Sequence, residues 1–306
     1  MNLPSITIGN RAWHVEFRTG SGFLYATLAA VLWSLIGPFS KECLGAGVSP
    51  LETAFWRALV GGLCFVAQAA LSGCLRIPPR DAIIFSLFGG WGIGVLFGAL
   101  QAAIQLSGAA MAMVLMYTAP AWVAVVSRFW FHEAITRQKR MALFIALAGT
   151  ALICFSGGSL QNGHSFMGIA CGLLSGLAYA SHFPFYTYWK KRYSISTIYA
   201  FMLLGGAVCL FPFAVFTSDK SWEIWGWLTS LGVLTNYLAY IALALSLQRI
   251  SQIQAAVIGN IEPLLATLWV WIFFGENFTA SGWAGCILII GSVFLLTIER
   301  KPTSQR

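Results

Sequence analysis

Apolar positions along this chain gather in ten long runs that short polar stretches separate. Each run approaches the roughly 20 apolar residues that one α-helix needs to cross the hydrocarbon core of a bilayer. The runs cover roughly residues 22–40, 52–73, 83–104, 110–130, 141–157, 167–187, 197–217, 224–246, 254–274 and 282–298. The pattern therefore predicts an all-α membrane protein with ten transmembrane helices, and the short connections leave no room for a soluble domain.

The composition agrees with this pattern. Hydrophobic residues make up 58% of the chain and charged residues only 9%, whereas a soluble domain carries about 25% charged residues. The lipid bilayer is thus the expected surrounding. Residues 1–20 are mixed and polar, without the apolar core and cleavage site of a signal peptide, so we expect them to form a tail.

The basic residues predict the orientation in the membrane. If ten spans cross in alternation, 15 Lys and Arg residues fall on one side, only Lys41 and Lys220 fall on the other, and Arg57 lies inside a span. Positive residues accumulate on the cytoplasmic side, so both tails, 1–20 and 299–306, are expected in the cytoplasm, with the bacterial inner membrane as the location. Because topology accounts for the net charge of +8, no nucleic-acid partner is expected.

Two halves of the chain repeat the same residue types. Pairs of glutamine, proline, glutamate and threonine recur at an offset of 143, namely Gln105 and Gln248, Pro120 and Pro263, Glu133 and Glu276, and Thr136 and Thr279. The first spans of the halves agree at an offset of 146, where Gly22, Trp33, Pro38 and Phe39 correspond to Gly168, Tyr179, Pro184 and Phe185. Five spans are an odd number, so the second half must enter the membrane from the opposite face. We predict two inverted five-helix repeats, residues 21–157 and 158–298.

Prolines inside these spans predict broken helices. Proline lacks a backbone N–H and frees the carbonyl four residues earlier; Pro120 would free Met116, and Pro263 would free Gly259. Any one such proline is explained by a packing kink. Both copies, however, carry a proline near mid-span, and free carbonyls in a membrane are tolerated where they face protein or a watered cavity. We therefore expect Pro120 and Pro263 to border a cavity.

These features together resemble the EamA branch of the drug/metabolite transporter superfamily. The resemblance rests on the paired mid-helix prolines, on the stretches 129–133 and 272–276 with their following threonines, on Phe55-Trp56-Arg57-Ala58, and on Glu262-Pro263. It covers nearly the whole chain except the tails. The resemblance implies alternating access around a central cavity, often with amino acids or related metabolites as exported substrates.

Charged residues within the spans are the first candidates for a site, since such residues are costly and usually functional. Glu262 is either a partner for a substrate amine or a proton carrier, or else a fixed partner of Arg57 or of freed backbone groups. Arg57 either holds a substrate carboxylate through its planar guanidinium or joins helices. Glu133 and Glu276 are expected at span ends, with Thr136 and Thr279 as N-caps of the next helices.

Aromatic and uncharged polar side chains near mid-depth complete the candidate site. A cavity for a small molecule is mostly apolar with a few convergent polar groups, and aromatic rings suit apolar amino acids or cations. For each aromatic ring, ordinary core packing is the alternative, and His182 is equally explained as a hydrogen-bonded core residue. The candidates for the cavity lining are Trp33, Trp91, Gln101, Tyr117, Tyr179, His182, Asn236, Tyr240 and Asn260.

No metal site or cofactor is expected. The seven cysteines lie in or beside apolar runs and form no C-x-x-C pair. Glycines four residues apart occur at 90, 94 and 98 and at 168, 172 and 176. This spacing allows close approach of two helices, either within the chain or across a homodimer.

Other classes of membrane protein fit less well. The chain lacks a pair of membrane aspartates, an H-E-x-x-H motif, and a G-x-S-G ahead of a span, so we expect no enzyme. It also lacks an ATP-binding loop. We predict a secondary transporter of small organic metabolites, most simply an amino-acid exporter, with a non-transporting receptor or assembly protein as the alternative.

Overall fold

A computed structural model describes residues 11–156, 165–274 and 279–297. These residues form helices and connecting turns without any strand. The elements are α1 Arg11–Ser34, α2 Ile36–Gly45, α3 Pro50–Leu71, α4 Pro79–Gly89, η1 Gly90–Val95, α5 Leu96–Ser107, α6 Ala109–Met116, α7 Ala119–Trp130, α8 Arg137–Ser156, α9 Phe166–Ala180, α10 His182–Trp189, α11 Ile195–Leu210, η2 Phe211–Phe213, α12 Trp222–Ser230, η3 Leu231–Leu238, α13 Ala239–Leu247, α14 Gln252–Gly259, α15 Ile261–Phe274 and α16 Ala280–Thr297.

Eight helical stretches in the described part of the chain are long and apolar enough to cross a membrane. They are Gly20–Gly45, Pro50–Leu71, Pro79–Ser107, Met111–Trp130, Arg137–Phe155, Phe166–Trp189, Ile195–Phe213 and Trp222–Leu247. Beyond them follow the pair α14 and α15 and the shorter apolar helix Ala280–Leu296. The prediction of an all-α, multi-pass membrane protein is thereby confirmed.

Three of these eight stretches, and the pair α14 and α15, are interrupted shortly before a proline. The breaks lie at Leu35, Tyr117–Thr118, Ser181 and Asn260, and the prolines follow within three residues as Pro38, Pro120, Pro184 and Pro263. Each break coincides with the carbonyl groups that a proline leaves without an N–H partner. As a result each of these stretches consists of two shorter helices that meet near mid-depth.

Two further stretches contain a π-helical turn. The turn η1 joins α4 to α5 over Gly90–Val95, and η3 joins α12 to α13 over Leu231–Leu238. Residues 90–95 shifted by the repeat offset of 143 become 233–238, which lie within η3. A π-turn adds one residue to the helix and is frequent at functional sites.

The helices pack through small residues. A Cβ atom on Gly22 would lie 2.7 Å from Ile250, and one on Gly168 would lie 2.1 Å from the Ser107 hydroxyl. The face of Gly168, Gly172 and Gly176 therefore packs against the α5–α6 region of the same chain. Likewise Gly90 and Gly94 face Cys209 of α11. Packing within the chain thus accounts for most of both glycine faces, although Gly98 has no such neighbour within 4 Å.

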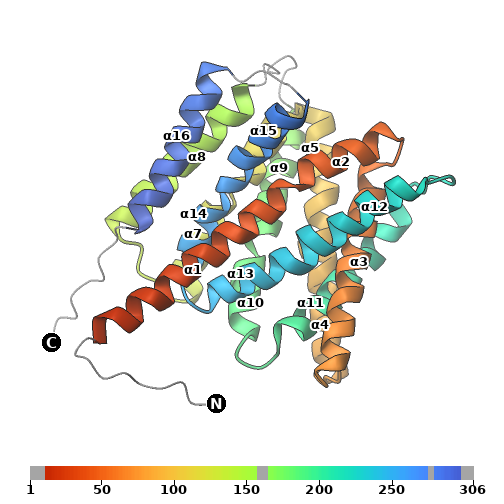
Figure 1. Ribbon diagram of the computed structural model, residues 1–306, viewed down its shortest axis with the longest axis horizontal. Helices are drawn as coiled ribbons and strands as arrows, with labels where there is room; N and C mark the ends of the chain where they lie inside the picture. Colours follow the sequence, from red (N-terminus) through yellow and green to blue (C-terminus); the bar gives the residue numbers. More distant parts are fainter. Residues whose placement is uncertain (1–10, 157–164, 275–278, 298–306) are drawn as a thin grey trace.

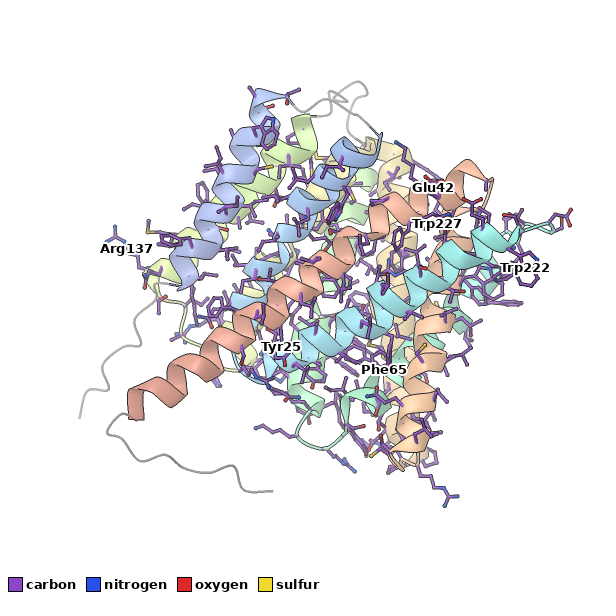
Figure 2. The ribbon with its side chains drawn as sticks, viewed as in Figure 1. Tyr25, Glu42, Phe65, Arg137, Trp222 and Trp227 are labelled. Atoms are coloured by element: carbon purple, nitrogen blue, oxygen red, sulfur yellow. The ribbon has the colours of Figure 1, made fainter. Side chains whose placement is uncertain are left out.

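The bundle has two distinct ends. The first turn of α1, the first turn of α8 and the last turn of α16 lie towards the same end, at the lower left of Figure 1. Glu42 and Trp222 lie at the other end, far from Arg137 (Figure 2). We call the first the α8-start end and the second the α2–α3 end, after the turn between Gly45 and Pro50. The expected N-caps are confirmed, since Thr136 accepts from Lys139 N at 3.2 Å and Thr279 from Gly282 N at 3.3 Å; Glu276 lies outside the described residues.

A candidate substrate cavity

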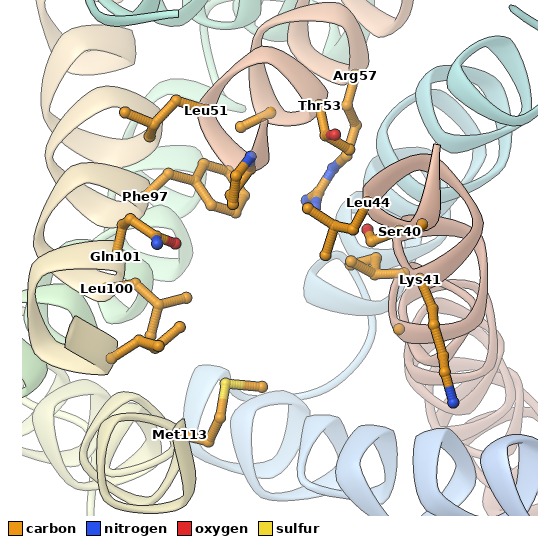
Figure 3. A pocket seen from close by; sticks show the side chains of 16 residues that line it. Ser40, Lys41, Leu44, Leu51, Thr53, Arg57, Phe97, Leu100, Gln101 and Met113 are labelled. Carbon is orange, nitrogen blue, oxygen red and sulfur yellow. The ribbon is translucent and has the colours of Figure 1, made fainter. Parts of the chain in front are cut away.

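A cavity of about 760 Å³ lies between α2, α3, α5 and α6. Figure 3 shows its labelled side chains around the hollow, with Thr53 and Arg57 across from Phe97, Leu100 and Gln101. We call it the outer chamber. It is lined by Ile36, Gly37, Ser40, Lys41, Leu44, Gly45, Pro50, Leu51, Thr53, Ala54, Arg57, Phe97, Leu100, Gln101, Ile104 and Met113. Gly45 and Pro50 flank the α2–α3 turn and are exposed, so the outer chamber reaches the surface at the α2–α3 end.

A smaller inner chamber of about 100 Å³ continues the cavity inwards. It shares Ile36, Arg57, Phe97, Leu100 and Met113 with the outer chamber. The residues that it adds are Trp33, Leu96, Met116, Tyr179, Tyr240 and Glu262. Both charged residues that the sequence placed inside spans therefore line one chamber, together with four aromatic side chains, Trp33, Phe97, Tyr179 and Tyr240.

Asn236 binds Arg57 at Nε and at the backbone carbonyl, which leaves the end of the guanidinium to the cavity. Its Nε donates to Oδ1 of Asn236 at 2.8 Å, and Nδ2 of Asn236 donates to the Arg57 carbonyl at 3.0 Å. The ring of Phe97 lies 4.9 Å from the guanidinium carbon. Figure 3 shows the guanidinium pointing into the hollow. Both expected roles of Arg57 are therefore visible, because it joins α3 to η3 and also faces the cavity.

Glu262 lies in the first turn of α15, directly after the break at Asn260. Its carboxyl group is hydrogen-bonded to Tyr117, which lies at the matching break between α6 and α7. Among the described residues, no ion pair within 4.0 Å joins Glu262 to Arg57. The alternative of a fixed ion pair between these two residues is thus not what the structure contains.

Trp33, Tyr179 and Tyr240 form an aromatic wall of the inner chamber. Trp33 meets Tyr179 edge-on at 6.0 Å and Tyr240 edge-on at 5.8 Å between ring centroids. Ring faces carry partial negative charge, so such a group attracts cations and also packs with apolar groups. Chemically, the inner chamber offers a guanidinium, a carboxyl group and an aromatic wall.

Other predicted site residues lie behind this wall. Trp91 Nε1 donates to the Ser181 hydroxyl at 3.0 Å, Nε2 of His182 pairs with the Gly92 carbonyl at 2.7 Å, and Asn260 Nδ2 donates to Thr150 at 3.4 Å. These side chains, like Tyr117 and Asn236, do not line the two chambers. Their polar atoms are used at helix breaks and π-turns, and this corrects the expectation that they form the lining. For His182 the core alternative holds.

Stacked tyrosines lead away from the inner chamber, starting at its lining residue Tyr240. Tyr240 stacks on Tyr199 at 4.6 Å, and Tyr199 stacks on Tyr186 at 5.8 Å. Gln248 donates to the Tyr186 hydroxyl at 3.2 Å, and the Lys190 amine donates to the Leu247 carbonyl. We call this group the tyrosine gate.

Ion pairs fix the loops at both ends. At the α2–α3 end the buried Glu52 pairs with Lys220 at 2.6 Å and accepts from Thr217 N at 3.0 Å. At the other end Asp81 lies 3.3 Å from Arg192 and accepts a hydrogen bond from Tyr193. This bond raises the pKa of the Tyr193 hydroxyl. From the sequence, Glu52 is expected near a span end and Asp81 in a loop, but the pattern does not reveal these partners.

The aromatic residue Phe97 is the main lining residue that the sequence did not single out. Its signal was present, because Phe97 precedes the candidate Tyr240 by the repeat offset of 143. Subtracting the offset of 143 from the position of Tyr240 therefore identifies Phe97 from the sequence.

Known proteins resemble this chain over most of its length. The sequence profile of the EamA-like transporter family matches residues 20–155 and 166–298. The uncharacterized transporter YdfC of Bacillus subtilis is 27% identical over 86% of each chain. An uncharacterized transporter of Archaeoglobus fulgidus is 28% identical over 88% of this chain and 93% of its own. The uncharacterized inner membrane transporter YicL of Salmonella typhimurium is 26% identical over 94% and 98%. A solved crystal structure superposes with a TM-score of 0.78 at 18% identity, covering 91% of this chain and 97% of the other, so the fold is shared.

Proposed function

Because this chain belongs to the EamA-like transporter family, we propose that it is a secondary transporter that moves small organic metabolites by alternating access. The observation that carries the proposal is a cavity that reaches the surface at one end of the bundle, while residues in matching positions stack on each other beyond its inner chamber. A transporter needs two such states, with the substrate site exposed to one side at a time.

Ten spans in two inverted halves, with 21–157 as the first unit and 158–298 as the second, are part of this proposal. The support is a set of paired features: two family matches, breaks before Pro120 and Pro263, π-turns η1 and η3, and N-cap serines Ser49 and Ser194. The α14–α15 pair and α16 would serve as spans nine and ten. The first helix of each half also contacts a turn of the other half, as the close approaches of Gly22 to Ile250 and of Gly168 to Ser107 indicate.

The repeat offsets relate the open chamber to the tyrosine gate. Ser40 corresponds to Tyr186 at offset 146, Ala54 to Tyr199 at the offset of 145 between the capping serines, and Phe97 to Tyr240 at offset 143. The first member of each pair lines the outer chamber, and the second belongs to the gate. Equivalent positions of the two halves thus line an open chamber at one end and contact each other at the other end. Alternating access requires this difference, because one end must close when the other opens.

The inner chamber favours a zwitterion as the substrate. A guanidinium binds a carboxylate through paired N–H groups, and an aromatic wall with a carboxyl group favours an ammonium group. Arg57, Glu262 and Tyr240 supply these three groups in one chamber. We infer that amino acids or related metabolites occupy it.

The charge distribution supports an orientation with both termini in the cytoplasm of a bacterial inner membrane. In that orientation the α2–α3 end, which carries Lys41, faces outwards, and the tyrosine gate closes the cytoplasmic path. We propose export as the direction, on the resemblance to amino-acid exporters.

A flux assay tests the proposal. Purified protein in liposomes is loaded with a panel of labelled amino acids, amines and organic acids, and efflux is followed with and without a proton gradient. Cells that lack or overproduce the protein provide the matching export measurement. We expect selective movement of at least one zwitterion, and the Arg57→Met protein as the control should move it with a weaker apparent affinity. A protein that moves no member of a broad panel would instead be a receptor or an assembly protein.

A further inference from the structure

Asn236 is a buried amide in the middle of the π-turn η3, with 1% of its surface exposed. Both polar atoms of its side chain are bonded to one residue, Arg57. Its oxygen accepts from Nε at 2.8 Å and its nitrogen donates to the Arg57 carbonyl at 3.0 Å. One side chain therefore fixes the backbone and the guanidinium of Arg57 at once.

This arrangement determines which part of the guanidinium is left for a ligand. Nε is occupied by Asn236, and the Phe97 ring lies against the guanidinium at 4.9 Å from its carbon. The two terminal nitrogens are left towards the hollow (Figure 3). A planar pair of N–H donors is the geometry that a carboxylate binds with two parallel hydrogen bonds.

The close approach of α3 to η3 depends on Gly61. A Cβ atom on Gly61 would lie 2.7 Å from Cβ of Asn236 and 3.1 Å from the Gly232 carbonyl. The extra residue of a π-turn changes the direction of the side chains that follow it. The backbone at this crossing is therefore built so that an amide on η3 reaches Arg57.

The equivalent crossing at the π-turn η1 shows whether packing of the helices requires a polar side chain. Ile93 of η1 corresponds to Asn236 at offset 143, and Met202 of α11 corresponds to Arg57 at offset 145. Ile93 packs closely on Gly206, where a Cβ would lie 2.6 Å from Cβ of Ile93. Because an apolar pair fills this matching crossing, the amide at 236 is not needed to pack the helices.

We propose that Asn236 is a positioning residue that orients the Arg57 guanidinium towards the carboxylate of the substrate. It acts through Arg57 and does not itself line the chambers. The proposal rests on the proposed transport function and adds the origin of its selectivity: the transporter distinguishes molecules with a carboxylate from those without one through the Asn236–Arg57 pair.

The test uses two probes that differ in the carboxylate alone, L-phenylalanine and phenethylamine. Each probe is added as a competitor to the flux of a labelled zwitterion in liposomes. The inhibition gives the apparent affinity of the probe for wild-type, Asn236→Leu, Arg57→Met and doubly substituted protein. The control is Thr235→Val, which removes from the same π-turn a buried hydroxyl that bonds only to the Leu231 carbonyl. Asn236→Leu should weaken L-phenylalanine about tenfold, leave phenethylamine within about twofold, and add nothing to Arg57→Met. Equal weakening of both probes, or the same effect from Thr235→Val, would overturn the proposal.

A second measurement needs no substrate and separates this proposal from the transport function. The NMR signal of the Arg57 Nε–H group reports how fast this proton exchanges with water. It is identified in arginine-labelled protein as the signal that is absent from Arg57→Lys. Asn236→Leu should accelerate the exchange at least tenfold, while Thr235→Val leaves it unchanged. If wild-type protein moves neither probe but this result is obtained, transport of amino acids fails and the positioning role stands. Unchanged exchange in Asn236→Leu refutes the positioning role whatever the flux assay gives.

Discussion

Arg57 and Glu262 line one chamber of about 100 Å³. Charged groups that leave water lose favourable hydration, and only good partners compensate for the loss. Here Arg57 is held at Nε by Asn236, and Glu262 is hydrogen-bonded to Tyr117. Each thus keeps part of its hydrogen-bonding capacity for a ligand. At the scale of single residues, the zwitterion that we propose as the substrate would complement both groups.

Replacing Arg57 by methionine should remove the carboxylate site while preserving much of the side-chain volume. The lost charge-assisted hydrogen bonds correspond to about 1.5–3 kcal/mol, or roughly 10- to 150-fold in affinity. Competition by L-phenylalanine should fall by this factor, whereas phenethylamine should still compete. A similar loss for both molecules would show that Arg57 serves only to join helices.

Glu262→Gln tests whether this carboxyl group carries a proton. Glutamine keeps a group that can bond to Tyr117 but cannot exchange a proton with substrate or water. We expect flux driven by a pH gradient to disappear while binding of the zwitterion survives, as measured by counterflow of labelled against unlabelled substrate. Coupling that remains at the wild-type level would exclude Glu262 as the proton carrier.

At the scale of elements, the bundle is held by helices that approach through glycine. The crossing of α4 and α11 is the closest, since a Cβ on Gly89 would lie 1.9 Å from the Met202 carbonyl and 2.7 Å from Gly206 N. Neither neighbour is the end of a flexible side chain, so the helices themselves would have to separate.

Gly89→Ala should therefore destabilise the protein by about 1–3 kcal/mol, which is the usual cost of overpacking. Gly98→Ala is the matched control, because no atom lies within 4 Å of its Cβ position on α5. Thermal unfolding in detergent, followed by tryptophan fluorescence, should show a lower midpoint for the first variant and little change for the second. Equal midpoints would contradict the packing described for α4 and α11.

At the scale of the whole molecule, the membrane class and the family were predictable, and so were the helix breaks. Long apolar runs suffice for the class, and Pro38, Pro120, Pro184 and Pro263 each produce a break within three residues. Six residues that the sequence singled out line the two chambers, and their contact with a substrate stays a prediction; they are Trp33, Arg57, Gln101, Tyr179, Tyr240 and Glu262.

The remaining site residues were not predictable for a physical reason. Each π-turn adds one residue to its helix, so a regular period of 3.6 residues no longer gives the direction of the side chains beyond it. Trp91 lies in η1 and Asn236 in η3, and both bond behind the wall instead of lining it. The partners of Glu52 and Asp81 come from distant loops, whose positions follow only from the assembled bundle.

Alternating access predicts two contacts that exclude each other. Lys190 meets Leu247 at the tyrosine gate, and the repeat offsets assign Leu44 and Ile104 to the corresponding places in the outer chamber. The contact at Leu247 is made by Lys190 Nζ and not by a Cβ atom, so the pair suits a short reducible cross-linker better than a direct disulfide. With the seven native cysteines replaced, such a reagent should join the pair Lys190→Cys and Leu247→Cys in the state described here. It should join the pair Leu44→Cys and Ile104→Cys only when the α2–α3 end has closed, because both positions line the outer chamber in this state.

Each cross-link should stop flux, and reduction of the reagent should restore it. Substrate that promotes exchange should raise cross-linking of the 44–104 pair and lower that of the 190–247 pair, which gel mobility under non-reducing conditions measures directly. Single-cysteine variants control for unspecific effects of the substitutions. If both cross-links form together in one molecule and flux continues, the two ends do not open in alternation, and the cavity at the α2–α3 end is a fixed vestibule.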